Sequence, residues 1–192
     1  MSLALRFALV SAFLIACSPL PSVADPAFLE HFAATYRFSL GEPAGFAVSA
    51  KGDAVYFLRS SSRSFVRDLY VFDVTRAEER KLLTAEQLLA GGEEKLSAEE
   101  RARRERLRLA AKGIAGFELS PDGARLLVPL SGKLFVVDVV GGAVRELTSA
   151  GGYPMDERFS PDGKTVACVR QGDLYVIEEG ADRFAYREGF FV

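Results

Sequence analysis

An all-β fold is predicted for this chain, in the form of a partial β-propeller with about three four-stranded blades and one charged α-helical insertion. The first observation is that "SPDG" occurs at residues 120–123 and again at residues 160–163. The second is that matching strand-like text follows each copy, "KLFVVDV" after the first and "DLYVIEE" after the second. A repeat of about 40 residues with several short strands is typical of propellers, whereas a β-sandwich gives no reason for the same text to recur at a fixed interval.

A third copy of the unit is expected upstream, in weaker form. Ser49–Gly52 stands where SPDG would be, "AVYFLRS" follows it, and "DLYVFDV" matches the later strand. In the middle copy we expect four strands, rich in Val, Leu and Phe and separated by turns that contain glycine. Their expected ranges are residues 116–120, 125–130, 133–139 and 143–147.

The SPDG sequence has the chemistry of a tight turn between two strands. Proline presets φ, aspartate accepts hydrogen bonds from the nearby backbone, and glycine tolerates a positive φ. The motif therefore predicts a hairpin corner in each blade and carries no binding function of its own.

The N-terminal residues are expected to direct export. The apolar run "FALVSAFLIA" at Phe7–Ala16 is shorter than the roughly 20 residues that span a bilayer, and it is typical of a signal peptide. Ser22 and Ala24 offer a cleavage site that gives a signal peptide of residues 1–24. Alternatively, "LIAC" resembles a bacterial lipobox, with a signal of residues 1–16 and lipidation of Cys17. A buried N-terminal helix is the third alternative. We expect a periplasmic protein or an outer-membrane lipoprotein, which would contact a membrane only through that lipid.

Composition places the chain among folded proteins and argues against nucleic acid as a partner. It is 49% hydrophobic and 26% charged, which is ordinary for a folded domain. A net charge of -2 gives no basic excess to neutralise phosphates. Cys168 is the one cysteine besides Cys17, so no intrachain disulfide is expected if Cys17 is cleaved away or lipidated, and "TVACVR" predicts that Cys168 is a buried apolar side chain.

A charged insertion, residues 85–113, separates the first two copies and is predicted to be helical. Ser97 and Glu100 have the spacing of a capping box, and Lys112–Gly113 would end the helix. Glutamates at its start and arginines at its end follow the helix dipole. We expect most of it to be solvated, either as a surface helix or as an arm that contacts a partner or frames a substrate opening. Three leucines are expected to contact the blades: Leu96, Leu107 and Leu109.

No self-sufficient catalytic, cofactor or metal site is predicted. "PDGKT" matches only the end of a phosphate-binding P-loop, because Arg158 occupies the place of its first glycine and the loop joins two strands. The G-x-S-x-G motif of hydrolases is absent from the sequence. His31, the single histidine, has no cysteine nucleophile or cluster of metal ligands near it in sequence.

The stretch "LLAGGEEKLSAEERARRERLRLAAKGIAGFELSPDGARLLVPLSGKLFVVDV" resembles the N-terminal propeller of bacterial dipeptidyl peptidase IV-like enzymes, serine peptidases of the prolyl oligopeptidase class. The resemblance continues through "DERFSPDGKTVACVRQGDLYVIE" and covers roughly residues 26–178. SPDG blades occur in many propellers, so the arginine-rich helix before the first SPDG is the more specific part.

The resemblance implies a substrate-gating role. In that family an eight-bladed propeller covers an α/β-hydrolase domain, and dipeptides are released from peptide N-termini, commonly after proline or alanine. A pair of propeller glutamates holds the substrate ammonium group, and propeller arginines bind a substrate carbonyl. Arg59 and Arg63 lie in the region from which such an arginine would come, but neither can be assigned. Glu178–Glu179 precede the family's glutamate segment, so the role is not carried onto them.

We therefore expect residues 25–192 to be a truncated propeller portion of such a peptidase, inactive alone because the triad serine, aspartate and histidine are missing. The expected partners are peptide substrates in the full-length family, together with the missing hydrolase domain or further copies of the chain. The alternative is a stand-alone exported propeller that acts as a protein-binding module. The long charged insertion argues against this alternative, because simple binding propellers do not need such an arm.

Overall fold

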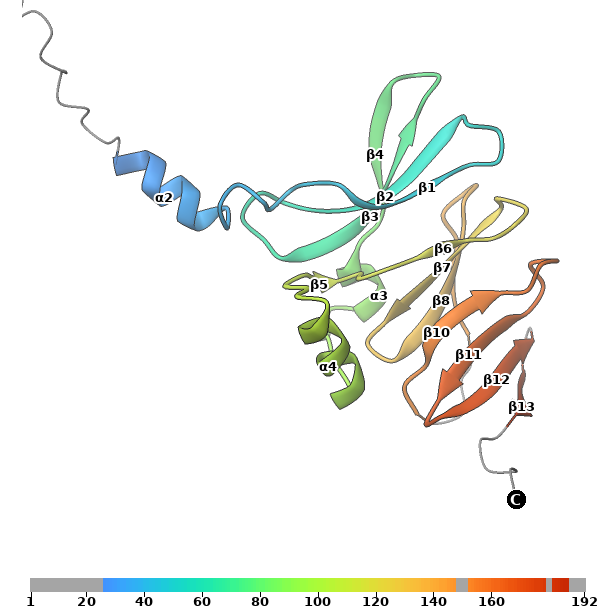
Figure 1. Ribbon diagram of the computed structural model, residues 1–192. Coiled ribbons are helices and arrows are strands. Elements are labelled where there is room, and N and C mark those ends of the chain that lie inside the picture. The colour runs from blue at the N-terminus through green and yellow to red at the C-terminus, as the bar shows by residue number, and fades with distance from the viewer. Residues whose placement is uncertain (1–25, 148–151, 179–180, 187–192) are drawn as a thin grey trace, which may run out of the picture.

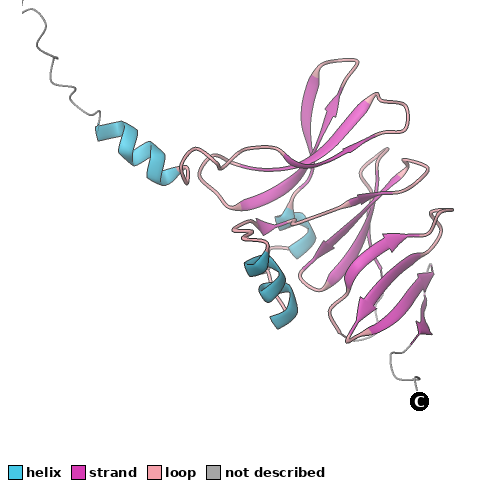
Figure 2. Cartoon of the chain, viewed as in Figure 1, coloured by secondary structure: helices cyan, strands magenta, loops and turns pink. Residues whose placement is uncertain are grey.

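The computed structural model describes residues 26–147, 152–178 and 181–186, and it is mostly β (Figures 1 and 2). Three antiparallel sheets follow one another in sequence order and fan out side by side, with few helices (Figure 1). The predicted signal segment, Cys17 and Glu179 lie outside the described residues. The all-β prediction is confirmed.

Each sheet has four strands paired antiparallel in chain order, and the first sheet has a fifth, short strand that pairs in parallel with its third strand. The first contains β1 (Ala44–Val48), β2 (Ala54–Ser60), β3 (Val66–Asp73) and β4 (Glu78–Leu83). The second contains β6 (Glu118–Leu119), β7 (Arg125–Leu130), β8 (Lys133–Asp138) and β9 (Val144–Leu147). The third contains β10 (Met155–Phe159), β11 (Val166–Arg170), β12 (Asp173–Glu178) and β13 (Ala181–Tyr186). The second sheet agrees with the predicted strands, although β6 is only two residues long.

The two SPDG motifs form the same turn, as predicted. In the second sheet the Ser120 hydroxyl donates to the Asp122 carboxylate at 2.5 Å and accepts the N–H of Arg125 at 2.9 Å. Ser160 and Asp162 repeat this contact at 2.5 Å in the third sheet. These hydrogen bonds lower the pKa of both aspartates, with the serine hydroxyl as the largest cause.

The turn of the first sheet keeps this geometry with a different sequence. Ser49 donates to Asp53 at 2.6 Å and accepts the N–H of Ala54 at 3.0 Å. The carboxylate therefore comes from the residue after the glycine, whereas Asp122 precedes its glycine. Gly52 and Gly123 adopt φ values of 71° and 70°, the left-handed conformation that glycine accepts most readily.

The second sheet buries both of its faces, because alternate residues of a strand point to opposite sides. Leu126 and Val137 belong to an apolar cluster with Leu58 and Leu69 of the first sheet. Leu127, Leu134 and Val136 belong to a separate cluster with residues of the third sheet, including Val166 and Cys168. The prediction that Cys168 is buried is confirmed. Face-to-face packing of apolar sheets thus holds the three units together.

The predicted continuous helix in the insertion is wrong. The structure has two short helices, α3 (Ala85–Leu89) and α4 (Ala98–Arg106), joined by a loop. Lys112–Gly113 do not end a helix: they form β5, which pairs in parallel with the start of β3. Gly113 adopts a φ of 72°, and a β-carbon there would lie 2.8 Å from the carbonyl oxygen of Arg67. The close approach of the two strands therefore requires glycine.

The predicted capping box is present in part. Ser97 caps α4 and accepts the N–H of Glu100 at 3.1 Å, but the Glu100 side chain turns to Arg104. A reciprocal capping box instead begins α3, between Thr84 and Gln87. The prediction for Leu107 is wrong, because this side chain is 55% exposed.

Gly132 lies in the turn between β7 and β8, next to Tyr153 of the segment before β10. A β-carbon at Gly132 would lie 2.9 Å from the Tyr153 ring, whereas one at Gly141 would meet nothing within 4 Å. Both glycines have positive φ, so the two alanine substitutions share the backbone strain. We expect Gly132→Ala to lower the free energy of unfolding by about 1–3 kcal/mol more than Gly141→Ala, through overpacking. Urea denaturation followed by circular dichroism measures both, and equal losses would contradict the predicted contact.

Candidate functional site

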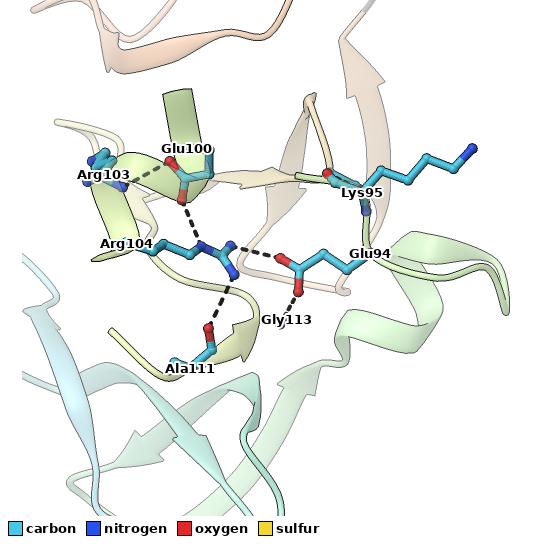
Figure 3. Close-up of polar contacts among 8 residues, drawn as sticks. Glu94, Lys95, Glu100, Arg103, Arg104, Ala111 and Gly113 are labelled. Atoms are coloured by element: carbon cyan, nitrogen blue, oxygen red, sulfur yellow. Dashed lines mark hydrogen bonds and ion pairs between the residues drawn. The ribbon is translucent and has the colours of Figure 1, made fainter. Parts of the chain in front are cut away.

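A buried network of charged side chains holds the parts of the insertion together (Figure 3). The Arg104 guanidinium lies between two carboxylates, with Nε 2.8 Å from Glu100 and Nη2 2.8 Å from Glu94. Its Nη1 donates to the carbonyl oxygen of Ala111 at 3.2 Å. The other carboxylate oxygen of Glu94 accepts the N–H of Gly113 at 2.8 Å. One guanidinium therefore joins α4, the loop before it and β5.

Burial makes this network costly to break. Glu100 and Arg104 are each only 7% exposed, whereas most residues of the insertion are exposed, as predicted. Burial alone would lower the pKa of Arg104, but the hydrogen bonds and charges of Glu100 and Glu94 outweigh it and raise that pKa. A buried ion pair is stable only where its hydrogen bonds are made, and here the guanidinium has three.

The spacing of residues along α4 explains the Glu100–Arg104 ion pair but not the Glu94–Arg104 pair. Glu100 and Arg104 are four residues apart on α4, the spacing that places two side chains on the same helix face. Glu94 reaches Arg104 from outside the helix, across a loop that contains Gly91–Gly92. A further link ties the loop to the second sheet: the N–H of Lys95 donates to the Ser131 hydroxyl at 2.5 Å.

A recess lies beside the network, between α4, the β7–β8 turn and the segment before β10. Its walls include Arg103, Lys133, Tyr153, Met155 and Glu157, and its volume is about 90 Å³. Small-molecule pockets occupy about 300–1,000 Å³, so the recess can take a side chain or a few waters but no larger ligand.

Two groups in the recess have shifted pKa values. Burial raises the pKa of the half-buried Glu157 carboxyl. Burial also raises the pKa of the Tyr153 hydroxyl. Lys133 is occupied elsewhere, in an ion pair with Glu146 at 2.9 Å. No nucleophile paired with a base is found among the residues that line this recess.

The predicted site residues are not brought together. Arg59 on β2 pairs with Glu79 at 2.6 Å and lies 5.5 Å from the Tyr70 ring, while Arg63 is exposed in the β2–β3 loop. His31 is exposed on α2 (Pro26–Ala34). Glu178 ends β12. The "PDGKT" stretch forms the β10–β11 turn and opens no helix, which agrees with the rejection of a P-loop.

The network itself was not predicted. Glu100–Arg104 could have been found from its helical spacing, but the sequence contains many such pairs in this insertion. Nothing in the sequence singles out Glu94 or the carbonyl group of Ala111. Among the residues that the structure describes, no group of three or more His, Cys, Asp or Glu could hold a metal ion. No helix in the same residues is long and apolar enough to cross a membrane.

Comparison with known proteins assigns no family. No protein-family model matches the chain. Among solved structures, the chain is similar to the crystal structure of TolB from Acinetobacter baumannii, with 15% sequence identity and a TM-score of 0.47. The match covers 76% of this chain and 32% of that one, so the chain spans about a third of that structure. Similarity at this level carries no conclusion about activity or partners.

Loss of the Arg104 guanidinium should destabilise the fold. Arg104→Ala would leave two buried carboxylates without their cation, and we expect a loss of about 3–5 kcal/mol in the free energy of unfolding. Arg106→Ala removes an exposed arginine from the same helix and should change it by less than about 0.5 kcal/mol. Chemical denaturation measures both variants. Equal effects would show that the buried network contributes no more than a surface charge.

Glu157 should make stability depend on pH. Because burial raises its pKa in the folded state, the folded chain holds the proton to higher pH than the unfolded chain. Stability attributable to this group is therefore present below its ordinary pKa of 4.5 and falls as pH rises through the folded-state pKa. Glu157→Gln should raise the melting temperature at pH 7 and flatten that part of the profile. A variant with the same pH profile as the wild type would contradict this.

Proposed function

We propose that this chain is the N-terminal propeller portion of a dipeptidyl peptidase IV-like serine peptidase. In this proposal the three sheets are consecutive propeller blades. They gate and bind peptide substrates for a hydrolase domain that these 192 residues do not contain. The observation that carries the proposal is the insertion between the first two sheets, whose parts are held together by buried ion pairs.

The packing of the sheets supports the propeller part of the proposal. In a propeller, four-stranded antiparallel sheets repeat around an axis. Here the second sheet packs on both neighbours through apolar side chains, which is the relationship expected of an interior blade. The first sheet leaves Phe46 and Val48 of β1 65% and 58% exposed. Exposed apolar side chains at a sheet edge are consistent with a further blade or another domain beside them.

The anchored insertion favours the peptidase over a simple binding propeller. The insertion is connected to β3 through the pairing of β5, and to the β7–β8 turn through the hydrogen bond of Lys95 to Ser131. An arm fixed at two places can present its exposed arginines to a substrate opening in a constant position. The second candidate remains a stand-alone exported propeller that binds a protein partner, and for it the same exposed arginines would form the contact surface.

The proposal includes export of the chain from the cytoplasm. The apolar run at Phe7–Ala16 supports a signal sequence, with either cleavage before Asp25 or lipidation of Cys17. The proposed location is the periplasm, in soluble form or as a lipoprotein of the outer membrane.

A peptidase assay tests where catalysis resides. The purified 192-residue chain should not hydrolyse an Ala-Pro or Gly-Pro reporter, because it contains no G-x-S-x-G motif and its one histidine lies on the exposed helix α2. An intact dipeptidyl peptidase run in parallel confirms that the reporter is competent. Reproducible turnover that purifies with the chain would overturn the proposal that a separate hydrolase domain supplies the catalytic groups.

Sequencing the gene beyond the codon for Val192 separates the two candidate functions. The peptidase proposal expects coding sequence there, in any frame, for a hydrolase domain with a G-x-S-x-G motif. Unrelated genes at that place would favour the stand-alone binding propeller.

A further inference from the structure

We propose that a second recess, beside the start of β3, binds a small carboxylate that carries an aromatic ring. This recess lies between the turn after α2, the β2–β3 loop and the segment after α4, and its volume is about 250 Å³. Its walls include Tyr36, Glu42, Phe65, Arg67 and Arg108. The inference is independent of the proposed peptidase role.

The charges of the recess favour an anion. Arg67 is half-buried and Arg108 is exposed, and the structure gives neither of them an ion pair with another described residue. Moving a guanidinium partly out of water without a counter-charge is costly, so Arg67 favours binding of an anion. The wall contains one carboxylate, that of the exposed Glu42, which leaves an excess of positive charge.

Two aromatic side chains make the recess suitable for a ring next to that anion. Tyr36 and Phe65 meet edge to face, with ring centroids 5.3 Å apart and planes at 69°. Such a corner presents one ring face and one ring edge, and both attract a third aromatic ring. The Arg37 guanidinium lies 5.8 Å from the Tyr36 centroid and adds positive charge beside the recess.

Backbone hydrogen bonds hold the main chain in place at both arginines without a ligand. Arg67 pairs with Ser60 of β2 on one side and with Gly113 of β5 on the other. Arg108 follows α4, and its N–H donates to the carbonyl oxygen of Glu105 at 3.0 Å. The segment after it ends at Ala111, whose carbonyl accepts from Arg104 of the buried network. These contacts fix the backbone at both arginines, which reduces the backbone part of the ordering cost of binding.

Two wall residues also hold an unusual backbone conformation. Tyr36 and Arg108 have φ values of 50° and 52°, in the left-handed region that side chains other than glycine rarely adopt. Such strain persists only where the surrounding structure imposes it, and it is concentrated at binding sites. Both residues line this recess.

An NMR titration of the full chain with phenylacetate tests the proposal. We expect saturable shifts of the backbone amides around Arg67 and Arg108. Phenylacetamide has the same shape without the charge, and inorganic phosphate has charge without the ring, so each should bind at least about tenfold more weakly. Equal binding of phenylacetamide would overturn the role of the arginines. Equal binding of phosphate would overturn the role of the aromatic corner.

Substitutions separate the recess from general surface charge. Arg67→Gln and Arg108→Gln should each weaken phenylacetate binding by about tenfold or more, because each removes a charge-assisted hydrogen bond. Glu42→Gln should strengthen binding, since it removes the opposing carboxylate. Arg63→Gln, in the exposed loop beside the recess, is the matched control and should change nothing. Thermal melts confirm folding, and the exposed Arg108 gives a decisive result even if Arg67→Gln unfolds. Unchanged affinity in Arg108→Gln would refute the site.

Discussion

The internal structure of the insertion depends on the burial of one guanidinium between two carboxylates. Arg104 receives Glu100 from its own helix and Glu94 from the preceding loop, and it donates to the carbonyl of Ala111 beyond the helix. A single side chain therefore determines where the loop, the helix and the following strand lie. The recess beside Tyr153 and the recess beside Arg67 both have walls from this insertion. The shape of both recesses therefore depends on the ion pairs of Arg104.

The repeated part of the fold could be predicted from the sequence because its determinants are local. Serine, aspartate and glycine within one turn set the hairpin, and alternation of apolar residues sets which strand faces are buried. The insertion was predicted less well, since its helix-forming residues continue to Ala111 while α4 ends at Arg106. Pairing of Lys112–Gly113 with β3 overrides that local preference. The end of α4 is therefore set by a contact with a distant strand, and helix propensities of single residues carry no information about such contacts.

The same distinction applies to function. The sequence resembles a peptidase propeller in its letters, but the structure contributes a different kind of observation: which charges are already paired and which are not. Arg59 forms an ion pair with Glu79, and Arg104 forms ion pairs with two glutamates. The structure gives Arg67 and Arg108 no ion pair with another described residue. An arginine that has no ion pair is therefore a better candidate for ligand binding than one that already pairs with a carboxylate.

The serine-carboxylate turn has a consequence for how repeats are recognised. Its carboxylate comes from the residue before the glycine at Asp122 and from the residue after it at Asp53, yet the serine hydroxyl makes the same two hydrogen bonds. Two different sequence motifs thus form the same turn. A search for SPDG finds two such turns in this chain, whereas a search for a hydroxyl that bridges a carboxylate and a strand N–H finds three among the described residues.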